Sequence, residues 1–232
     1  MGERAEKYRA ELGRLKRWQP YLNKHSGLPG PRANLELVRA VGDEADSRLL
    51  WRFAASDDEF LALCGAAGLG RLAVTDPDRV MARLRELASD SRWRVREGVA
   101  MALQRIGRQD MAWLLGEMKA WAGGEPLVQR AAAAGLCEPA LLSNPGDVKQ
   151  VAALLDRITA SIEAAPERRE DDFRVLRQAL GYCWSVAAAA APEDVVGYME
   201  RWLRSSDPDV RWIMKQNLAK ARMARVRSLL SG

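Results

Sequence analysis

The stretch DSRWRVREGVAMALQRI, residues 90–106, opens with an aspartate and continues into a helical pattern. Val95, Val99 and Leu103 follow one another every four residues, so they lie on one face of a helix. The stretch SDPDVRWIMKQNL, residues 206–218, repeats the order of Asp, Val-Arg and spaced apolar residues. Its proline directly after an aspartate fits the first helical turn, where a missing N–H costs nothing. Both stretches therefore predict helices with a capped start.

The four-residue spacing recurs at five places along the chain. The first residues of successive triplets are 34, 33, 48 and 34 positions apart, so three of the four intervals agree within one residue. Such a period predicts an array of helix pairs, and the one long interval predicts an insertion near residues 143–171. The triplets are Leu61-Gly65-Leu69, Val95-Val99-Leu103, Val128-Ala132-Leu136, Leu176-Leu180-Trp184 and Val210-Met214-Leu218.

The pattern as a whole predicts an all-α fold. Apolar and polar residues do not alternate over any sustained stretch, and the hairpin pairs Asn-Gly and Asp-Gly do not occur. The connections between predicted helices are mostly short, which makes successive helices antiparallel neighbours, and we expect a break from Pro20 to Pro31. The predicted helices lie near residues 3–18, 32–45, 47–55, 58–73, 77–89, 92–107, 109–122, 126–138, 147–164, 171–190, 193–204 and 208–221.

The motif at residues 90–107 and 206–221 resembles the second helix of HEAT-like repeats, in the armadillo-type α-solenoid superfamily. The resemblance covers roughly residues 30–222, and it implies a right-handed α-α superhelix of about five helical repeats. We expect residues 31–232 to form this solenoid as one domain, with residues 1–30 as an N-terminal helix and a Pro/Gly linker that cap it. The resemblance also implies a ladder of charge-assisted hydrogen bonds between neighbouring repeats. Its members would be Asp90 with Arg96 and Asp207 with Arg211.

Composition excludes several kinds of protein. With 48% hydrophobic and 29% charged residues, the chain is too apolar to be disordered throughout. The single histidine, His25, excludes most chemistry that relies on imidazole, and we expect no catalytic residues, no cofactor and no metal site. Three widely spaced cysteines argue against a disulfide framework and favour a reducing, cytoplasmic setting. No apolar segment is long enough to cross a membrane.

A glycine-rich segment, Gly65-Ala66-Ala67-Gly68-Leu69-Gly70, superficially resembles a dinucleotide-binding motif. Its glycines stand in the reverse order, and no predicted strand precedes it. We therefore interpret the segment as a site of close helix packing.

The predicted function is that of a non-enzymatic scaffold that binds a macromolecular partner, in the first place a protein. The second helices of HEAT-like solenoids line a concave face, and counting away from the core places a mixed polar set there. The basic residues gather at the ends: residues 1–24 carry seven Lys or Arg against three acids, and residues 201–232 carry eight against two. We expect the concave face and this basic C-terminal cap to bind the partner. The predicted partner-binding residues are Arg105, Tyr182, Trp212, Gln216 and Lys220.

A nucleic-acid-binding solenoid is the alternative. Residues 181–186 and 92–96 faintly resemble helices of the DNA alkylation repeat glycosylases, which implies contacts with DNA. The family's catalytic aspartate in an aromatic cleft has no evident counterpart, so this alternative is predicted to lack glycosylase activity. Basic side chains would then bind phosphate. The candidates are Arg92, Arg94, Lys215, Lys220, Arg222 and Arg225.

Overall fold

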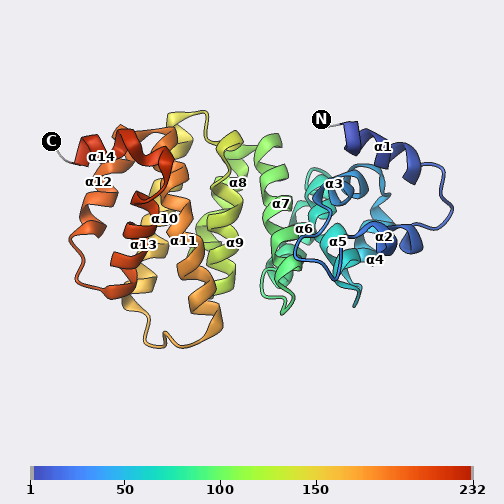
Figure 1. Cartoon of the computed structure of the whole chain (residues 1–232), viewed down its shortest axis with the longest axis horizontal. Helices are drawn as coiled ribbons and strands as arrows, with labels where there is room; N and C mark the ends of the chain where they lie inside the picture. Colours follow the sequence, from blue (N-terminus) through green and yellow to red (C-terminus); the bar gives the residue numbers. More distant parts are fainter. Residues whose placement is uncertain (1–2, 231–232) are drawn as a thin grey trace. The chain divides into compact units, whose positions relative to one another are not determined.

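The structure is a computed structural model that describes residues 3–230, and every regular element in that range is helical (Figure 1). The all-α prediction is therefore confirmed. The α-helices are α1 (Glu3–Leu12), α2 (Gln19–His25), α3 (Leu35–Glu44), α4 (Ser47–Ala54), α5 (Glu59–Leu72), α6 (Pro77–Leu87), α7 (Trp93–Gln109), α8 (Met111–Trp121), α9 (Pro126–Leu136), α10 (Pro145–Ala164), α11 (Asp171–Ala190), α12 (Pro192–Leu203), α13 (Pro208–Leu218) and α14 (Ala224–Leu230), with 3-10 turns η1 (Pro139–Leu141) and η2 (Ala221–Met223).

Internal contacts divide the chain into two compact units. The first runs to Ile106 and the second begins at Gly107, so the division falls in the last turn of α7. The sequence pattern marks no boundary at this point, because the apolar repeat continues across it.

In the first unit, α5 is the central helix. Every residue from Phe60 to Gly70 is buried, and α3, α4 and α6 pack around this segment. A Cβ atom at Gly65 would collide with the main chain of Phe53 and Ala54 at the end of α4. One at Gly70 would lie 2.6 Å from the Ala102 carbonyl oxygen of α7. The glycine-rich segment is thus a place where helices approach closely, as predicted.

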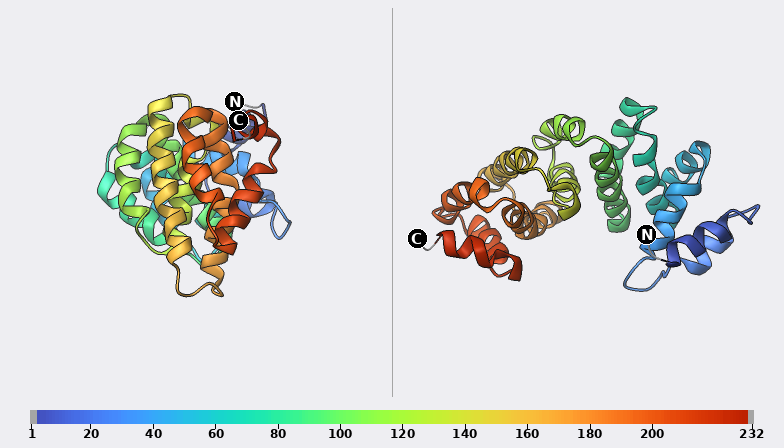
Figure 2. Two further views of the ribbon diagram at one scale, coloured as in Figure 1. Left: turned by 90° about the vertical axis from the view of Figure 1, so that its left-hand side faces the viewer. Right: turned by 90° about the horizontal axis from the view of Figure 1, so that it is seen from above.

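In the second unit, the helices stack in two rows that follow chain order. Among the first helices of successive pairs, α10 contacts both α8 and α12, and among the second helices α11 contacts both α9 and α13. The right-hand view of Figure 2 shows the two rows from green to red. The core-facing residues Leu176, Leu180 and Trp184 of α11 are at most 1% exposed, as the triplet spacing predicts.

Some predicted boundaries were wrong at the two ends. The first helix ends at Leu12 rather than near residue 18, and α2 occupies part of the predicted break. The reason is that Pro20 lies in the first turn of α2, where proline is tolerated, so it begins a helix instead of interrupting one. Helix α1 packs on α3. After α13, a 3-10 turn and α14 continue the chain, and α14 packs on α12.

The predicted insertion near residues 143–171 is mostly helix. Helices α10 and α11 have 20 residues each, against 11 in α8 and α9, and residues 165–170 form the connection between α10 and α11. The long repeat interval is therefore explained by a longer helix pair more than by a longer loop.

Candidate functional site

Helix α13 begins with a firmly capped turn. The Asp207 carboxylate accepts hydrogen bonds from the Asp209 and Val210 N–H groups, both at 3.0 Å, and Pro208 occupies the first turn. Val210, Ile213 and Met214 are fully buried, which fixes the rotation of the helix. Trp212 consequently lies on the side of α13 away from its core face, half-buried.

Helix α11 holds the Trp212 ring in place. The Arg177 guanidinium stacks 3.9 Å from the ring centroid, and its Nε lies 2.8 Å from Asp209 Oδ1. The ring edge rests against Gly181, where a Cβ atom would come within 3.0 Å of it. The stacked arginine on one side and the glycine without a side chain at the ring edge therefore hold this aromatic side chain in one orientation at the protein surface.

Tyr182, the neighbour of Gly181, stands more open to solvent. Its side chain is 43% exposed. Arg222 Nη2 donates a hydrogen bond of 3.0 Å to Tyr182 Oη, and Lys220 Nζ lies 6.0 Å from the ring centroid. We call this surface the Trp212–Tyr182 face. It comprises Arg177, Tyr182, Trp212, Gln216, Lys220 and Arg222.

A shallow hollow of about 460 Å³ borders Trp212 on its other side. Its apolar walls come from the end of α12 and from both ends of α13, while Arg211 and Lys215 stand on its rim. Neither of these cations has an ion-pair partner among residues 3–230. We call it the α12–α13 pocket, and its lining is Leu203, Pro208, Arg211, Trp212, Lys215 and Leu218.

Four of the five predicted partner-binding residues thus belong to one surface of the second unit: Tyr182, Trp212, Gln216 and Lys220. The fifth, Arg105, belongs to the first unit. Its Nη1 donates a 2.7 Å hydrogen bond to Asp43 Oδ1 of α3, so its positive charge is paired with a carboxylate of the same unit. The sequence could not reveal this pair, because its two members are 62 residues apart.

The carboxylates of the two aspartates of the predicted ladder pair with arginines other than those expected. The Asp90 carboxylate pairs with Arg92, whose Nη1 also donates to the Ser56 and Asp57 carbonyl oxygens of the preceding interhelical loop. Asp207 pairs at 2.6 Å with Arg168, which lies in the connection between α10 and α11. The predicted Asp207–Arg211 pair was wrong, because Arg211 points to the exposed side of α13.

Arg96, the predicted partner of Asp90, donates a hydrogen bond of 2.6 Å from its Nη1 to the Asp90 carbonyl oxygen. The hydrogen bond from Arg92 lowers the pKa of Asp90. Burial acts to raise the pKa of Asp207, but the Val210 N–H and the Arg168 guanidinium together hold it below its ordinary value.

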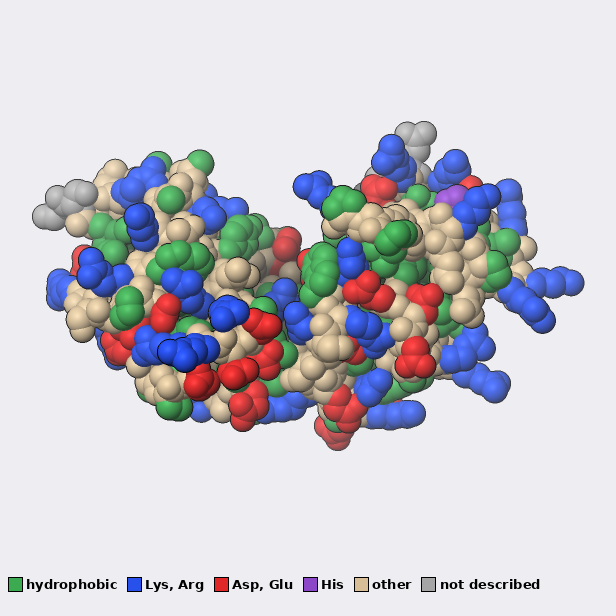
Figure 3. Space-filling model, turned by 60° about the horizontal axis from the view of Figure 1, so that its bottom comes forward, with side chains coloured by type: hydrophobic (Ala, Val, Ile, Leu, Met, Phe, Trp, Pro, Cys, Tyr) green, Lys and Arg blue, Asp and Glu red, His purple; other side chains and the backbone are tan. Residues whose placement is uncertain are grey.

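Half of the predicted phosphate-binding residues are engaged elsewhere. Arg92 is bonded as described, and Arg94 pairs with Glu59 at 3.0 Å and donates to the Gly30 carbonyl oxygen. Arg225 pairs with Glu193 of α12. Lys215, Lys220 and Arg222 have no carboxylate partner among the described residues. On the face drawn in Figure 3, basic and acidic side chains are interspersed within each unit rather than sorted into a stripe.

The structure reveals neighbours of the predicted site residues that the sequence pattern missed. Arg177 and Arg168 neutralise Asp209 and Asp207, which leaves the cations of α13 uncompensated. Asn217 is fully buried and bonds to the main chain of α11. In the sequence, Asn217 could have been noticed as a polar residue among the apolar positions of a helix. Arg168 and Arg177 occupy no position in the repeat pattern that would have singled them out.

Within residues 3–230, no cluster of three or more His, Cys, Asp or Glu side chains is arranged to hold a metal ion. In the same range, no helix combines the length and the apolar character needed to cross a membrane.

No protein-family model matches the chain, and no curated protein matches its sequence. One similar solved structure is the crystal structure of an engineered protein from the Northeast Structural Genomics Consortium. It shares 18% identity with this chain at a TM-score of 0.42, over the full length of both. That likeness is too low to assign a fold family or a function, so the resemblance to HEAT-like repeats stays a prediction.

Proposed function

We propose that the protein is a non-enzymatic, HEAT-like helical-repeat scaffold that binds an acidic segment of a partner protein through the Trp212–Tyr182 face and the adjoining α12–α13 pocket. The observation that carries the proposal is the position of Trp212, which is held by Arg177 and borders a hollow rimmed by unpaired cations. Aromatic side chains held in one orientation are the usual anchors of protein interfaces.

The charges of α13 favour an acidic partner. Its two carboxylates, Asp207 and Asp209, are already neutralised by arginines from α11 and from the connection before it. Arg211 and Lys215 remain without a carboxylate, and so do Lys220 and Arg222 beside Tyr182. A surface with this balance attracts negative charge and increases the association rate of an acidic ligand.

The walls of the pocket favour a protein over a nucleic acid. Leu203, Pro208 and Leu218 form an apolar hollow that would bury an aliphatic or aromatic side chain. The backbone of a duplex, whose bases are stacked inside, presents no group that gains from such a hollow, and three of the six cations predicted to bind phosphate are paired within the molecule. We therefore infer an acidic peptide segment with one apolar anchor residue.

Selection from a random peptide library displayed on phage tests this proposal without assuming a partner. Enriched peptides are expected to carry Asp or Glu around an apolar residue. Their affinity, measured by fluorescence anisotropy, should fall about tenfold or more in Trp212→Ala and in Lys215→Glu, because an anchor and a rim charge are lost. Lys149→Glu, an equal charge change on the exposed side of α10, is the matched control and should bind normally.

Two outcomes would contradict the proposal. Enriched peptides that bind both variants as tightly as the unaltered protein would show that this surface is not the binding site. Binding of a labelled DNA duplex that weakens steeply with salt and is lost in Lys215→Glu, with no peptide bound, would assign the surface to nucleic acid instead.

A further inference from the structure

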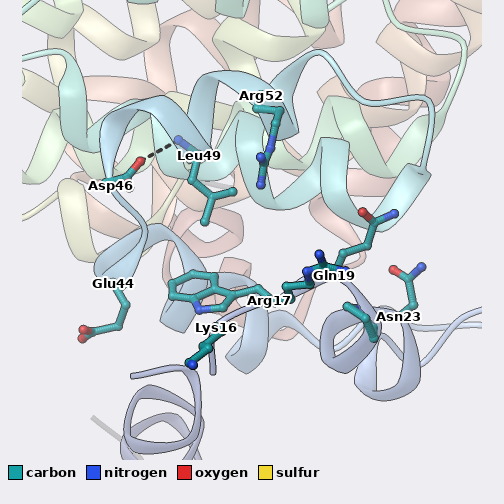
Figure 4. Close-up of a pocket in the computed structure, with 10 residues that line it drawn as sticks. Lys16, Arg17, Gln19, Asn23, Glu44, Asp46, Leu49 and Arg52 are labelled. Atoms are coloured by element: carbon teal, nitrogen blue, oxygen red, sulfur yellow. Dashed lines mark hydrogen bonds between the residues drawn. The ribbon is translucent and has the colours of Figure 1, made fainter. Parts of the chain in front are cut away.

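A larger hollow, of about 960 Å³, lies in the first unit. It is open to solvent and is lined by the connection between α1 and α2, by α2 itself, by the end of α3 and by α4. Figure 4 shows Arg52 on α4, with Lys16 and Arg17 on the opposite side of the hollow. The lining is Lys16, Arg17, Trp18, Gln19, Pro20, Asn23, Glu44, Asp46, Leu49 and Arg52.

Each of the two carboxylates that line this hollow interacts with a positive group of the protein itself. Asp46 caps α4, since its Oδ1 accepts a 2.7 Å hydrogen bond from the Leu49 N–H. Glu44 Oε1 lies 3.8 Å from Nε of Arg9, a residue outside the lining that pairs more closely with Asp43. Each acid is thus offset in part by a positive group of the fold, a cationic side chain or the N-terminal end of a helix, and the lining still holds three cations against two acids.

The three cations of the hollow are not compensated. Lys16, Arg17 and Arg52 have no carboxylate partner among residues 3–230, and all three line the same hollow, Arg52 from α4 and the other two from the connection between α1 and α2. An anion bound in the hollow would be attracted to all three charges. Arginine side chains also present paired N–H donors that match phosphate and carboxylate groups.

The size of the hollow and its remaining lining residues restrict the class of ligand that it can bind. The hollow is many times larger than one inorganic ion and lies at the upper end of the range of small-molecule pockets, about 300–1,000 Å³. Trp18 and Leu49 add apolar surface to the lining, and the side-chain amides of Gln19 and Asn23 supply hydrogen-bonding groups. A molecule with more than one anionic group on a less polar body would match this lining.

We propose that this hollow in the first unit binds a small organic polyanion, whose anionic groups are phosphates or carboxylates. The inference does not rest on the proposed function, because none of its residues belongs to the Trp212–Tyr182 face. Calorimetric titration of the full chain at low ionic strength provides the test, with ADP as the phosphate probe and citrate as the carboxylate probe. At least one probe is expected to bind with one-to-one stoichiometry, and the difference between them identifies the anionic group.

Two variants of α4 make the test specific. Arg52→Ala is expected to weaken the bound probe about tenfold or more, because it removes charge-assisted hydrogen bonds. Arg48→Ala removes the same charge from the same helix, but Arg48 faces a different hollow and should leave the affinity within about twofold. Both side chains are exposed, so both variants should fold, as circular dichroism will verify. Absence of binding by both probes, or equal weakening in the two variants, would overturn the proposal.

Discussion

Asn217 is the buried polar side chain that joins α13 to α11. Its Oδ1 accepts a 2.7 Å hydrogen bond from the Ser185 N–H, and its Nδ2 donates to the Leu180 and Ile213 carbonyl oxygens, each at 2.8 Å. These bonds fix the distance and the rotation between the two helices that present Trp212 and Tyr182. The amide is therefore part of the framework that holds the proposed binding surface.

Asn217→Ala should destabilise the protein by about 2–4 kcal/mol, because buried main-chain groups lose their side-chain partner and a small void remains. Urea unfolding followed by circular dichroism measures this change. The exposed Lys215→Ala on the same helix is the control and should change the unfolding free energy by less than about 0.5 kcal/mol. A stability loss equal to that of the control would show that the buried amide has no structural role.

The cysteines give a second test of burial. Cys64, Cys137 and Cys183 are free and buried. Burial raises the pKa of the Cys64 thiol, and the hydrogen bond with Cys183, together with burial, raises that of Cys137. Because the thiolate is the reactive form, the native protein should react slowly with a disulfide reagent such as Ellman's reagent at mildly alkaline pH. All three thiols should react at once in guanidinium chloride, and rapid labelling of the native protein would contradict the packing described here.

Helix packing in the first unit depends on the absence of a side chain at Gly65. A methyl group there would meet the main chain of α4, which cannot move aside as a flexible side chain could. Gly65→Ala should therefore cost about 3 kcal/mol or more in unfolding free energy. At Gly116, an exposed glycine of α8 with no atom within 4 Å of the added Cβ, the same substitution should stabilise by about 0.5–1 kcal/mol.

Thermal and urea unfolding of these two variants distinguishes the effect of close helix packing on stability from the effect of helix propensity. Propensity alone would make both substitutions stabilising, so the opposite signs depend on the contact between α4 and α5. A stabilised Gly65→Ala variant would mean that the two helices can separate without loss.

The sequence predicts features that are local to one helix, but not contacts between residues that are far apart in the chain. Spacing along the chain predicted the triplets that face the core, because apolar periodicity is a local property of one helix. It did not identify Arg168 as the partner of Asp207 or Asp43 as the partner of Arg105, since 39 and 62 residues separate these pairs. Four of the five predicted partner-binding residues fall on one surface because they lie on, or just beyond, adjacent second helices. The hollow beside Trp18 was missed because part of its lining lies in an irregular connection.

Across the whole chain, the same kind of capped loop recurs in both units. Asp90 in the first accepts hydrogen bonds from the N–H and the guanidinium of Arg92, and Asp207 in the second accepts them from the N–H groups of the following turn and pairs with Arg168. The pKa of each carboxyl lies below its ordinary value of about 4. The unfolded chain therefore binds protons more readily at these positions than the folded chain, and acid must weaken the fold.

The expected loss of stability in acid can be tested with the double variant Asp90→Asn/Asp207→Asn. Above the ordinary carboxyl pKa, both aspartates contribute their full stabilisation, and it is lost as the pH falls through the lowered values of the folded state. At neutral pH, the double variant should be less stable by about 1–2 kcal/mol, a modest figure because solvent screens part of each interaction. Near pH 2.5 this difference should shrink, since the protonated aspartates of the unaltered protein no longer hold their arginines as anions. Urea unfolding at several pH values measures both quantities. A difference that stays constant from neutral to acidic pH would show that the side-chain shape at these positions, rather than its charge, stabilises the loops.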